Sequence, residues 1–204
     1  MITKIAILLL ITFIKCDILN VPSDYLTIQN AINSSSENDT ILIAPGTYYE
    51  NLIIDDININ FLSSNGSETT IIDGSSVYNP VFTFNNISDP FILDGLTIQN
   101  GTGLTINGAS YGGGILSNNS NILISNMIIQ NNFAFAGGGI CFYATQNINT
   151  SPIINNTQIQ NNLASEGGGI FCVNHNLTIF NTNITRNGMD LFGSGGGIQA
   201  LLSE

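Results

Sequence analysis

Short apolar runs alternate with asparagine and glycine from about residue 40 onward. Residues 121–125, 127–129 and 140–143 are examples, rich in Ile, Leu and Phe. Runs of this length, bounded by turn-forming residues, are typical of β-strands. The same region keeps no 3.6-residue apolar period over three turns, so the pattern excludes a helical repeat.

A repeat orders these runs. Gly-Gly-Gly-Ile occurs four times, beginning at Gly112, Gly137, Gly167 and Gly195, with spacings of 25, 30 and 28 residues. A second element, an apolar run that ends in asparagine, recurs at 96–100, 127–132, 158–162 and 183–187. A period of this size indicates a solenoid, propeller or array, and propeller blades need about 40 residues each. We therefore expect an all-β, single-stranded parallel β-helix with three short strands per coil.

Asparagine and glycine suit the corners of such a coil. Asparagine tolerates the left-handed backbone conformation, and stacked asparagines can pass amide hydrogen bonds along the coils. Glycine suits corners with positive φ or close backbone approach. Aligning the coils on the glycines places Cys141 one position before Cys172. Because successive strand residues face opposite sides, we expect two separate thiols; a disulfide would require a register slip.

The start of the chain differs from the repeats. Ser23-Asp24 is a candidate N-cap for a short helix that runs to about Ser34, and residues 22–36 form a predicted cap on the first coil. Strands are expected at 40–44 and 52–54, with a turn at Pro45-Gly46. A capping helix would keep water from the strand edges and the apolar interior at this end.

Two segments carry a family resemblance. Residues 27–32 (TIQNAI) and 39–51 (DTILIAPGTYYEN) resemble the opening of pectin-lyase-like right-handed parallel β-helix proteins, and 93–100 (LDGLTIQN) resembles their early coils. The glycine repeats are similar to those of chlamydial polymorphic outer-membrane proteins, with Gly and Ile where that motif has Ala and Phe. The resemblance covers roughly residues 20–200 and implies the right-handed fold; it says much less about activity.

The first residues predict export. Lys4 precedes an apolar run from Ile5 to Ile14, which is the layout of a signal peptide and too short to span a bilayer. We assign 1–16 to the signal and 17–204 to the β-helix domain of a secreted or surface protein. Ten Asn-x-Ser/Thr sequons then predict glycosylation if the source is eukaryotic. They are at Asn33, Asn38, Asn65, Asn86, Asn100, Asn118, Asn149, Asn155, Asn176 and Asn183.

The net negative charge of the chain limits the classes of partner that it can bind. The chain has 14 acids and three strong bases, and without residues 1–16 its formal charge changes from −11 to −13, with Arg186 as the remaining base. This argues against nucleic acid and anionic lipid, which need clustered Lys and Arg. It argues equally against an anionic polysaccharide held by basic side chains. No segment after the predicted signal peptide resembles a membrane span.

The enzymes of the resembled superfamily imply groups that this sequence mostly lacks. Lyases use an Arg or Lys base, commonly with Ca²⁺, but Arg186 occupies a slot that holds Gln or Asn in earlier repeats. Hydrolases need several converging carboxylates, and the adjacent pair Asp55-Asp56 fits a polar turn better. The methylesterase-type Asp-Phe-Ile-Phe-Gly motif is absent. We therefore assign no catalytic, cofactor-binding or metal-binding residue.

Three remaining polar residues have plainer explanations. Asp73 and Asp94 each precede glycine, which favours turns, although a Ca²⁺ held by surface carboxylates stays an alternative. His175 lies between two asparagines, which favours an exposed loop.

The sequence favours a non-catalytic extracellular protein that binds another protein or a glycan through its sheet faces. The alternative is a polysaccharide-degrading enzyme, a lyase or glycoside hydrolase, or an N-terminal fragment of one. The chain stops at Glu204, shortly after the fourth glycine motif and without an evident cap. Truncation, with further residues beyond Glu204, and end-to-end self-association are both open on this evidence.

Overall fold

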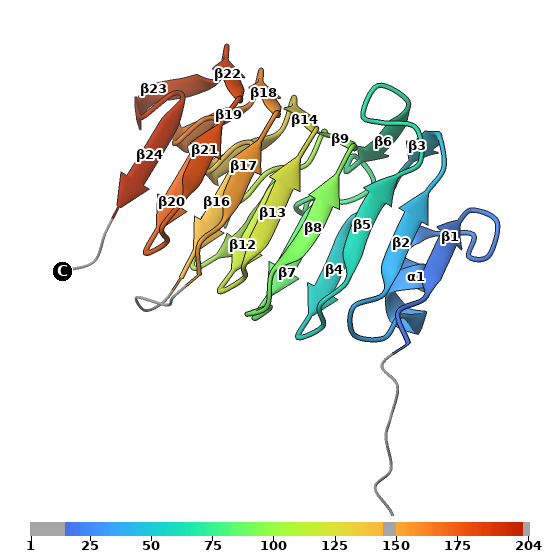
Figure 1. Cartoon of the computed structure of the whole chain (residues 1–204). Helices are drawn as coiled ribbons and strands as arrows, with labels where there is room; N and C mark the ends of the chain where they lie inside the picture. Colours follow the sequence, from blue (N-terminus) through green and yellow to red (C-terminus); the bar gives the residue numbers. More distant parts are fainter. Residues whose placement is uncertain (1–14, 145–149, 202–204) are drawn as a thin grey trace, which may run out of the picture.

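The computed structural model describes residues 15–144 and 150–201, so most of the expected signal, residues 1–14, lies outside the described residues. The described chain forms a right-handed parallel β-solenoid whose coils stack along one axis (Figure 1). Four sheets run along that axis. This confirms the predicted fold class.

Sheets A and B meet at a short corner. Sheet A contains β1 (Ile18–Val21), β2 (Thr40–Ile43), β5 (Asn60–Ser63), β8 (Phe91–Asp94), β13 (Ile122–Ser125), β17 (Ile153–Asn155) and β21 (Thr178–Phe180). Sheet B contains β3 (Gly46–Tyr48), β6 (Thr70–Asp73), β9 (Thr97–Gln99), β14 (Ile128–Gln130), β18 (Gln158–Gln160) and β22 (Asn183–Thr185). All neighbours within these two sheets are parallel.

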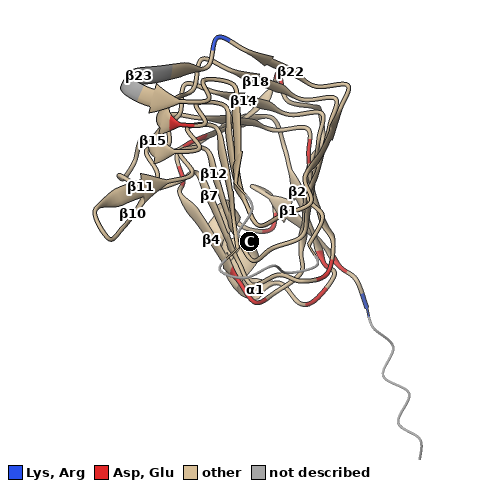
Figure 2. Ribbon diagram, turned by 90° about the vertical axis from the view of Figure 1, so that its left-hand side faces the viewer, with Lys and Arg blue, Asp and Glu red and all other residues tan. Residues whose placement is uncertain are grey.

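Sheets C and D complete the coil. Sheet C contains β4 (Leu52–Asp55), β7 (Phe82–Asn85), β12 (Ile115–Asn118), β16 (Ile140–Tyr143), β20 (Ile170–Val173) and β24 (Ile198–Leu201). Sheet D contains β10 (Leu104–Ile106), β11 (Ala109–Tyr111), β15 (Phe133–Ala136), β19 (Leu163–Glu166) and β23 (Gly188–Ser194). The later coils therefore have four strands, and the expectation of three was wrong. The hairpin β10–β11 is antiparallel and projects from the body of the solenoid (Figure 2).

Strand alternation builds two apolar cores. In sheet C, residues such as Phe82 and Phe84 point inward to the main core, together with the inner faces of sheets A and B. The outer face of sheet C contacts sheet D through a second, smaller core made of Leu116, Ala136, Cys141 and Phe171. Burial of these side chains is the main stabilising term for the stack.

The predicted cysteine geometry is confirmed. Cys141 pairs in register with Phe171, and Phe142 pairs with Cys172. Cys141 accordingly packs in the small outer core and Cys172 in the main core, and both are free thiols. Burial raises the pKa of each thiol, so both stay protonated.

Both expected uses of glycine occur in one motif. Gly137 has φ +67°, a conformation that side-chain-bearing residues rarely adopt. A Cβ on the next residue, Gly138, would lie 2.6 Å from the carbonyl oxygen of Leu163. The motif therefore turns the chain and lets neighbouring coils approach closely.

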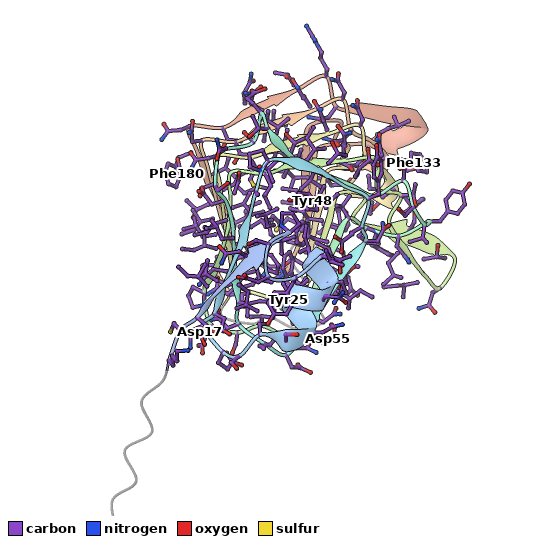
Figure 3. All side chains as sticks on the ribbon, turned by 90° about the vertical axis from the view of Figure 1, so that its right-hand side faces the viewer. Asp17, Tyr25, Tyr48, Asp55, Phe133 and Phe180 are labelled. Atoms are coloured by element: carbon purple, nitrogen blue, oxygen red, sulfur yellow. The ribbon has the colours of Figure 1, made fainter. Side chains whose placement is uncertain are left out.

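Helix α1 (Ile28–Ser34) covers the first coil, with Ile28, Ala31 and Ile32 buried against it. The predicted N-cap was wrong: Thr27 caps the helix, and the Glu50 carboxylate accepts hydrogen bonds from the first two helical amides. Asp24 instead accepts hydrogen bonds from the backbone and side chain of Asn20. Figure 3 looks onto this capped end, with Tyr25 and Tyr48 beside the helix. No helix among the described residues is long and apolar enough to cross a membrane.

Candidate glycan-binding groove on sheet C

The outer face of sheet C carries two parallel rows of side chains. Asp55, Asn85, Asn118 and Tyr143 occupy equivalent positions in successive strands, and Ile53, Thr83, Leu116 and Cys141 form the row beside them. One row is polar and the other mainly apolar. At about 4.8 Å per coil, the polar row is roughly 15 Å long.

Hydrogen bonds connect the polar row. Asn118 Nδ2 donates to Asn85 Oδ1 at 2.7 Å, and Asn85 Nδ2 donates to Asp55 Oδ1 at 2.6 Å. Each amide thus donates toward the preceding coil. A carboxylate accepts but cannot donate, so Asp55 is the natural first member of this ladder. Within the described residues, only Oδ1 of Asp55 makes a hydrogen bond, and Asp55 lines a pocket.

Two neighbouring pockets make this face a groove. The first, about 230 Å³, lies over Asp55 and Asn85 and is walled by the loop that carries Val77, Asn79 and Pro80 and by Leu104. The second, about 140 Å³, lies over Leu116, Asn118 and Tyr143, and the hairpin β10–β11 forms its wall. The ladder therefore passes from one pocket into the next.

Tyrosines flank the second pocket. Tyr111, on the hairpin, and Tyr143, on sheet C, have ring centroids 6.1 Å apart. Burial, together with nearby Cys141, Tyr143 and Glu166, raises the pKa of Tyr111 above its ordinary value, so this phenol is neutral near pH 7. Each tyrosine offers an apolar ring face and a polar hydroxyl.

Asn51 fixes the wall of the first pocket. Its Nδ2 donates to the carbonyl oxygens of Gly74, Asn79 and Pro80, at 2.9 to 3.2 Å. Its Oδ1 is buried and has no hydrogen-bond partner among the described residues. Buried acceptors are normally satisfied, so this oxygen is an exception beside the pocket that Asn51 lines.

The other candidate acids serve ladders on other faces. Asp73, at the end of sheet B, accepts from Gln99, and Gln130 and Gln160 continue that ladder. Burial favours a higher pKa for Asp73, but hydrogen bonds from Ser75, Gln99 and Asn100 outweigh it and lower the pKa. Asp94, the last residue of β8 in sheet A, accepts from Ser125 and Asn126. The structure thus places Asp55, Asp73 and Asp94 on three separate faces.

Arg186 and His175 do not join the groove. Arg186 is exposed with φ +54°, in the slot that holds Asn131 and Asn161 in earlier coils, as predicted for a turn residue. His175 was expected in an exposed loop, and this was wrong. It is 5% exposed, its Nδ1 lies 2.6 Å from Thr150 Oγ1, and its ring packs edge-on against Phe142. Burial lowers its pKa.

No group of three or more His, Cys, Asp or Glu side chains that could hold an ion occurs in the described part of the chain. The sequence reasoning also missed the groove itself. Asn107-Gly108, between two short strand-forming runs, is a strong hairpin signal and would have located its wall.

The architecture defines a right-handed parallel β-helix protein with a polar groove on one face. No protein-family model matches the chain, and no curated protein sequence matches it. Among solved structures, a pectin methylesterase mutant in complex with a hexasaccharide is similar, with a TM-score of 0.56, 14% identity, and 93% of this chain and 60% of that one covered. The rice weevil pectin methyl esterase has a TM-score of 0.52, 17% identity, and coverage of 83% and 57%.

These likenesses show the shared fold. They confirm the expected right-handed parallel β-helix fold, whereas the resemblance to outer-membrane repeats stays a prediction. The chain spans about three fifths of the length of both pectin methylesterases.

Proposed function

We propose that this chain is a secreted, non-catalytic β-helix protein that binds a glycan in the groove on sheet C. The single observation that carries the proposal is the continuous ladder from Asp55 to Asn118, which runs beside an apolar row and ends at two tyrosines. A sugar chain offers hydroxyl groups and apolar C–H faces, and the groove supplies partners for both. Ligand sites commonly combine an apolar lining with a few placed polar groups.

Charge favours a neutral glycan. The pockets are lined by asparagine, tyrosine, threonine and apolar residues together with one carboxylate, Asp55. A polyuronate would bring further negative charge to a chain with a formal charge of −11. We therefore expect neutral polysaccharides to bind more tightly than polygalacturonate, with the difference reduced by added salt.

Binding to a panel of neutral and acidic polysaccharides tests the proposal, by affinity electrophoresis or calorimetry. The variant Asn118→Ala is expected to weaken binding, and Gln160→Ala, which shortens the equivalent ladder on sheet B, is the matched control. Equal loss in both variants, or no binding to any polysaccharide, would contradict the groove assignment.

A polysaccharide-modifying enzyme is the second candidate. Two observations favour it: the fold is shared with two pectin methylesterases, and the carboxylate residue Asp55 lines a pocket. If it is correct, purified protein releases methanol or new sugar ends from a polysaccharide. Asp55→Asn should abolish that release, and Asp94→Asn, on another face, should retain it.

Export through residues 1–16 is part of the proposal. A chain that begins at Asp17 keeps all of β1, and the backbone nitrogen of Asp17 already donates to the buried Asp39 carboxylate at 2.7 Å. Cleavage there would convert that nitrogen into an ammonium group beside a carboxylate, which strengthens the contact. N-terminal sequencing of the secreted product tests this, and a start well inside β1 would contradict it.

A further inference from the structure

The described residues contain nine of the ten sequons. Their asparagines differ in exposure and in whether Nδ2 donates a hydrogen bond. An N-glycan is attached to the asparagine Nδ2 atom. A side chain whose Nδ2 is free and exposed can carry a glycan without loss of a native hydrogen bond. A side chain whose Nδ2 is a ladder donor keeps a single N–H once a sugar is attached, and its glycan must then leave the surface beside the residue that accepts this hydrogen bond.

Two sequon asparagines are ladder donors. Asn118 Nδ2 donates to Asn85 Oδ1 at 2.7 Å inside the groove, and Asn100 Nδ2 donates to Asp73 Oδ2 at 2.8 Å. A glycan on Asn118 would also occupy the pocket that this residue lines. A glycan at either position would therefore crowd the native ladder.

Three other sequon asparagines lie at the corner where the chain enters sheet A. Asn38 lies two residues before the start of β2, Asn86 follows β7, and Asn176 lies two residues before the start of β21. All three are exposed, and within the described residues none of their Nδ2 atoms donates a hydrogen bond. Asn86 uses only its oxygen, which accepts from Asn119 at 3.2 Å. None of the three lines the groove pockets.

We propose that Asn38, Asn86 and Asn176 are N-glycosylation sites that form one glycosylated edge, and that Asn100 and Asn118 stay unmodified in the folded protein. The donor class is a lipid-pyrophosphate-linked oligosaccharide. The bond between Nδ2 and the sugar C1 forms as the bond from C1 to phosphate breaks. The lipid pyrophosphate leaves, and the amide nitrogen gives up one proton. The proposal rests on export, which brings the chain to a compartment that holds this donor.

The test is a site-by-site occupancy measurement. The chain is secreted from a eukaryotic host, once with its own leader and once with a host leader, and its peptides are mapped by mass spectrometry before and after enzymatic glycan removal. We expect glycan on Asn38, Asn86 and Asn176 and none on Asn100 or Asn118 in secreted, folded protein. Occupied Asn118 in that fraction, or an unoccupied edge, would overturn the proposal.

Matched variants separate the explanations. Asn86→Gln should lower the mass of the secreted protein by one glycan, whereas Asn118→Gln should leave the glycan mass unchanged. If only the host leader gives secretion, the export proposal fails while the occupancy map still tests the sites. A loss of glycan mass in Asn118→Gln would contradict the assignment directly.

Discussion

Two of the side-chain amide ladders along the solenoid have contrasting surroundings: one lies inside the corner after sheet B and one on the outer face of sheet C. In the inner ladder, Asn132 Nδ2 donates to Asn162 Oδ1, and Asn162 Nδ2 donates to Asn187 Oδ1, each at 3.0 Å. The backbone amide of Asn132 also donates to Asn162 Oδ1, the side-chain oxygen of the equivalent asparagine in the next coil. Asn132 and Asn162 are each 1% exposed.

The groove ladder has the same chemistry with different surroundings. Asn85 and Asn118 are only partly buried, and each leaves hydrogen-bonding capacity toward the pockets. A buried amide must be satisfied within the protein, whereas an exposed one can exchange water for a ligand. The comparison teaches that one repeated device can stabilise the fold where it is buried and offer a binding surface where it is not.

Removal of one inner rung should have the largest effect. Asn162→Ala removes the acceptor of the Asn132 backbone amide, one of the two acceptors of Asn132 Nδ2, and the side-chain donor to the Ile129 carbonyl. We expect a loss of about 3 kcal/mol or more in unfolding free energy, measured by urea denaturation. Gln160→Ala, at a half-buried ladder position two residues away, should cost about 1 kcal/mol or less. Equal losses would show that burial does not distinguish the ladders.

Crowding the inner ladder should have the next largest effect. A Cβ on Gly139 would lie 2.5 Å from the Gly169 carbonyl oxygen and 3.0 Å from Asn162 Nδ2. Gly139→Ala should therefore destabilise by about 2 kcal/mol through overpacking. Gly197, the equivalent residue in the last coil, has its nearest atom at 3.9 Å, so Gly197→Ala is the control and should have little effect. Thermal denaturation of both variants measures the difference.

A broken groove ladder should affect binding more than stability. Asn85→Ala removes the link between Asp55 and Asn118, which costs about 1 kcal/mol or less in unfolding free energy. Glycan affinity should fall roughly tenfold, the equivalent of about 1.4 kcal/mol. Titration calorimetry together with urea denaturation checks both values. A large stability loss with unchanged affinity would reverse the roles given to the two ladders.

Titration of His175 should have the smallest effect on stability. It tests how burial affects a polar group that belongs to no ladder. Its Nε2 is buried without a partner, and burial lowers its pKa below 6.5. The unfolded chain then binds the proton more readily, so stability should be retained above pH 6.5 and decrease as the pH falls below it. His175→Gln should remove this dependence between pH 7.5 and 5.5 in denaturation experiments. An unchanged pH profile in that variant would assign the effect elsewhere.

Much of the fold could be predicted from the glycine and asparagine pattern. The register that pairs Leu116, Cys141 and Phe171 follows directly from alignment of the glycine motifs, because each coil repeats the same corner. The fourth strand per coil was not predicted, because β15 and β19 lie within the segments between asparagine and glycine and have no separate turn signal. The helix N-cap was misplaced because Asp24 satisfies Asn20 instead.

The candidate site was much harder to predict. Asp55 looked like part of a turn, and Tyr111 and Tyr143 are 32 positions apart in the sequence. Their proximity depends on how far the hairpin β10–β11 leans over sheet C. His175 was misjudged because its polar neighbours suggest exposure, whereas packing against Phe142 buries it.

The sequence by itself determined the repeat, the parallel β-helix and the opposite orientation of the two cysteines, because these depend on local turn chemistry and on the two-residue period of a strand. The tertiary structure alone decided which amides are buried and which line a groove. Stacking brings residues about 30 positions apart into contact, and the projecting hairpin walls one face. Burial depends on those distant neighbours, and the residue type does not encode it.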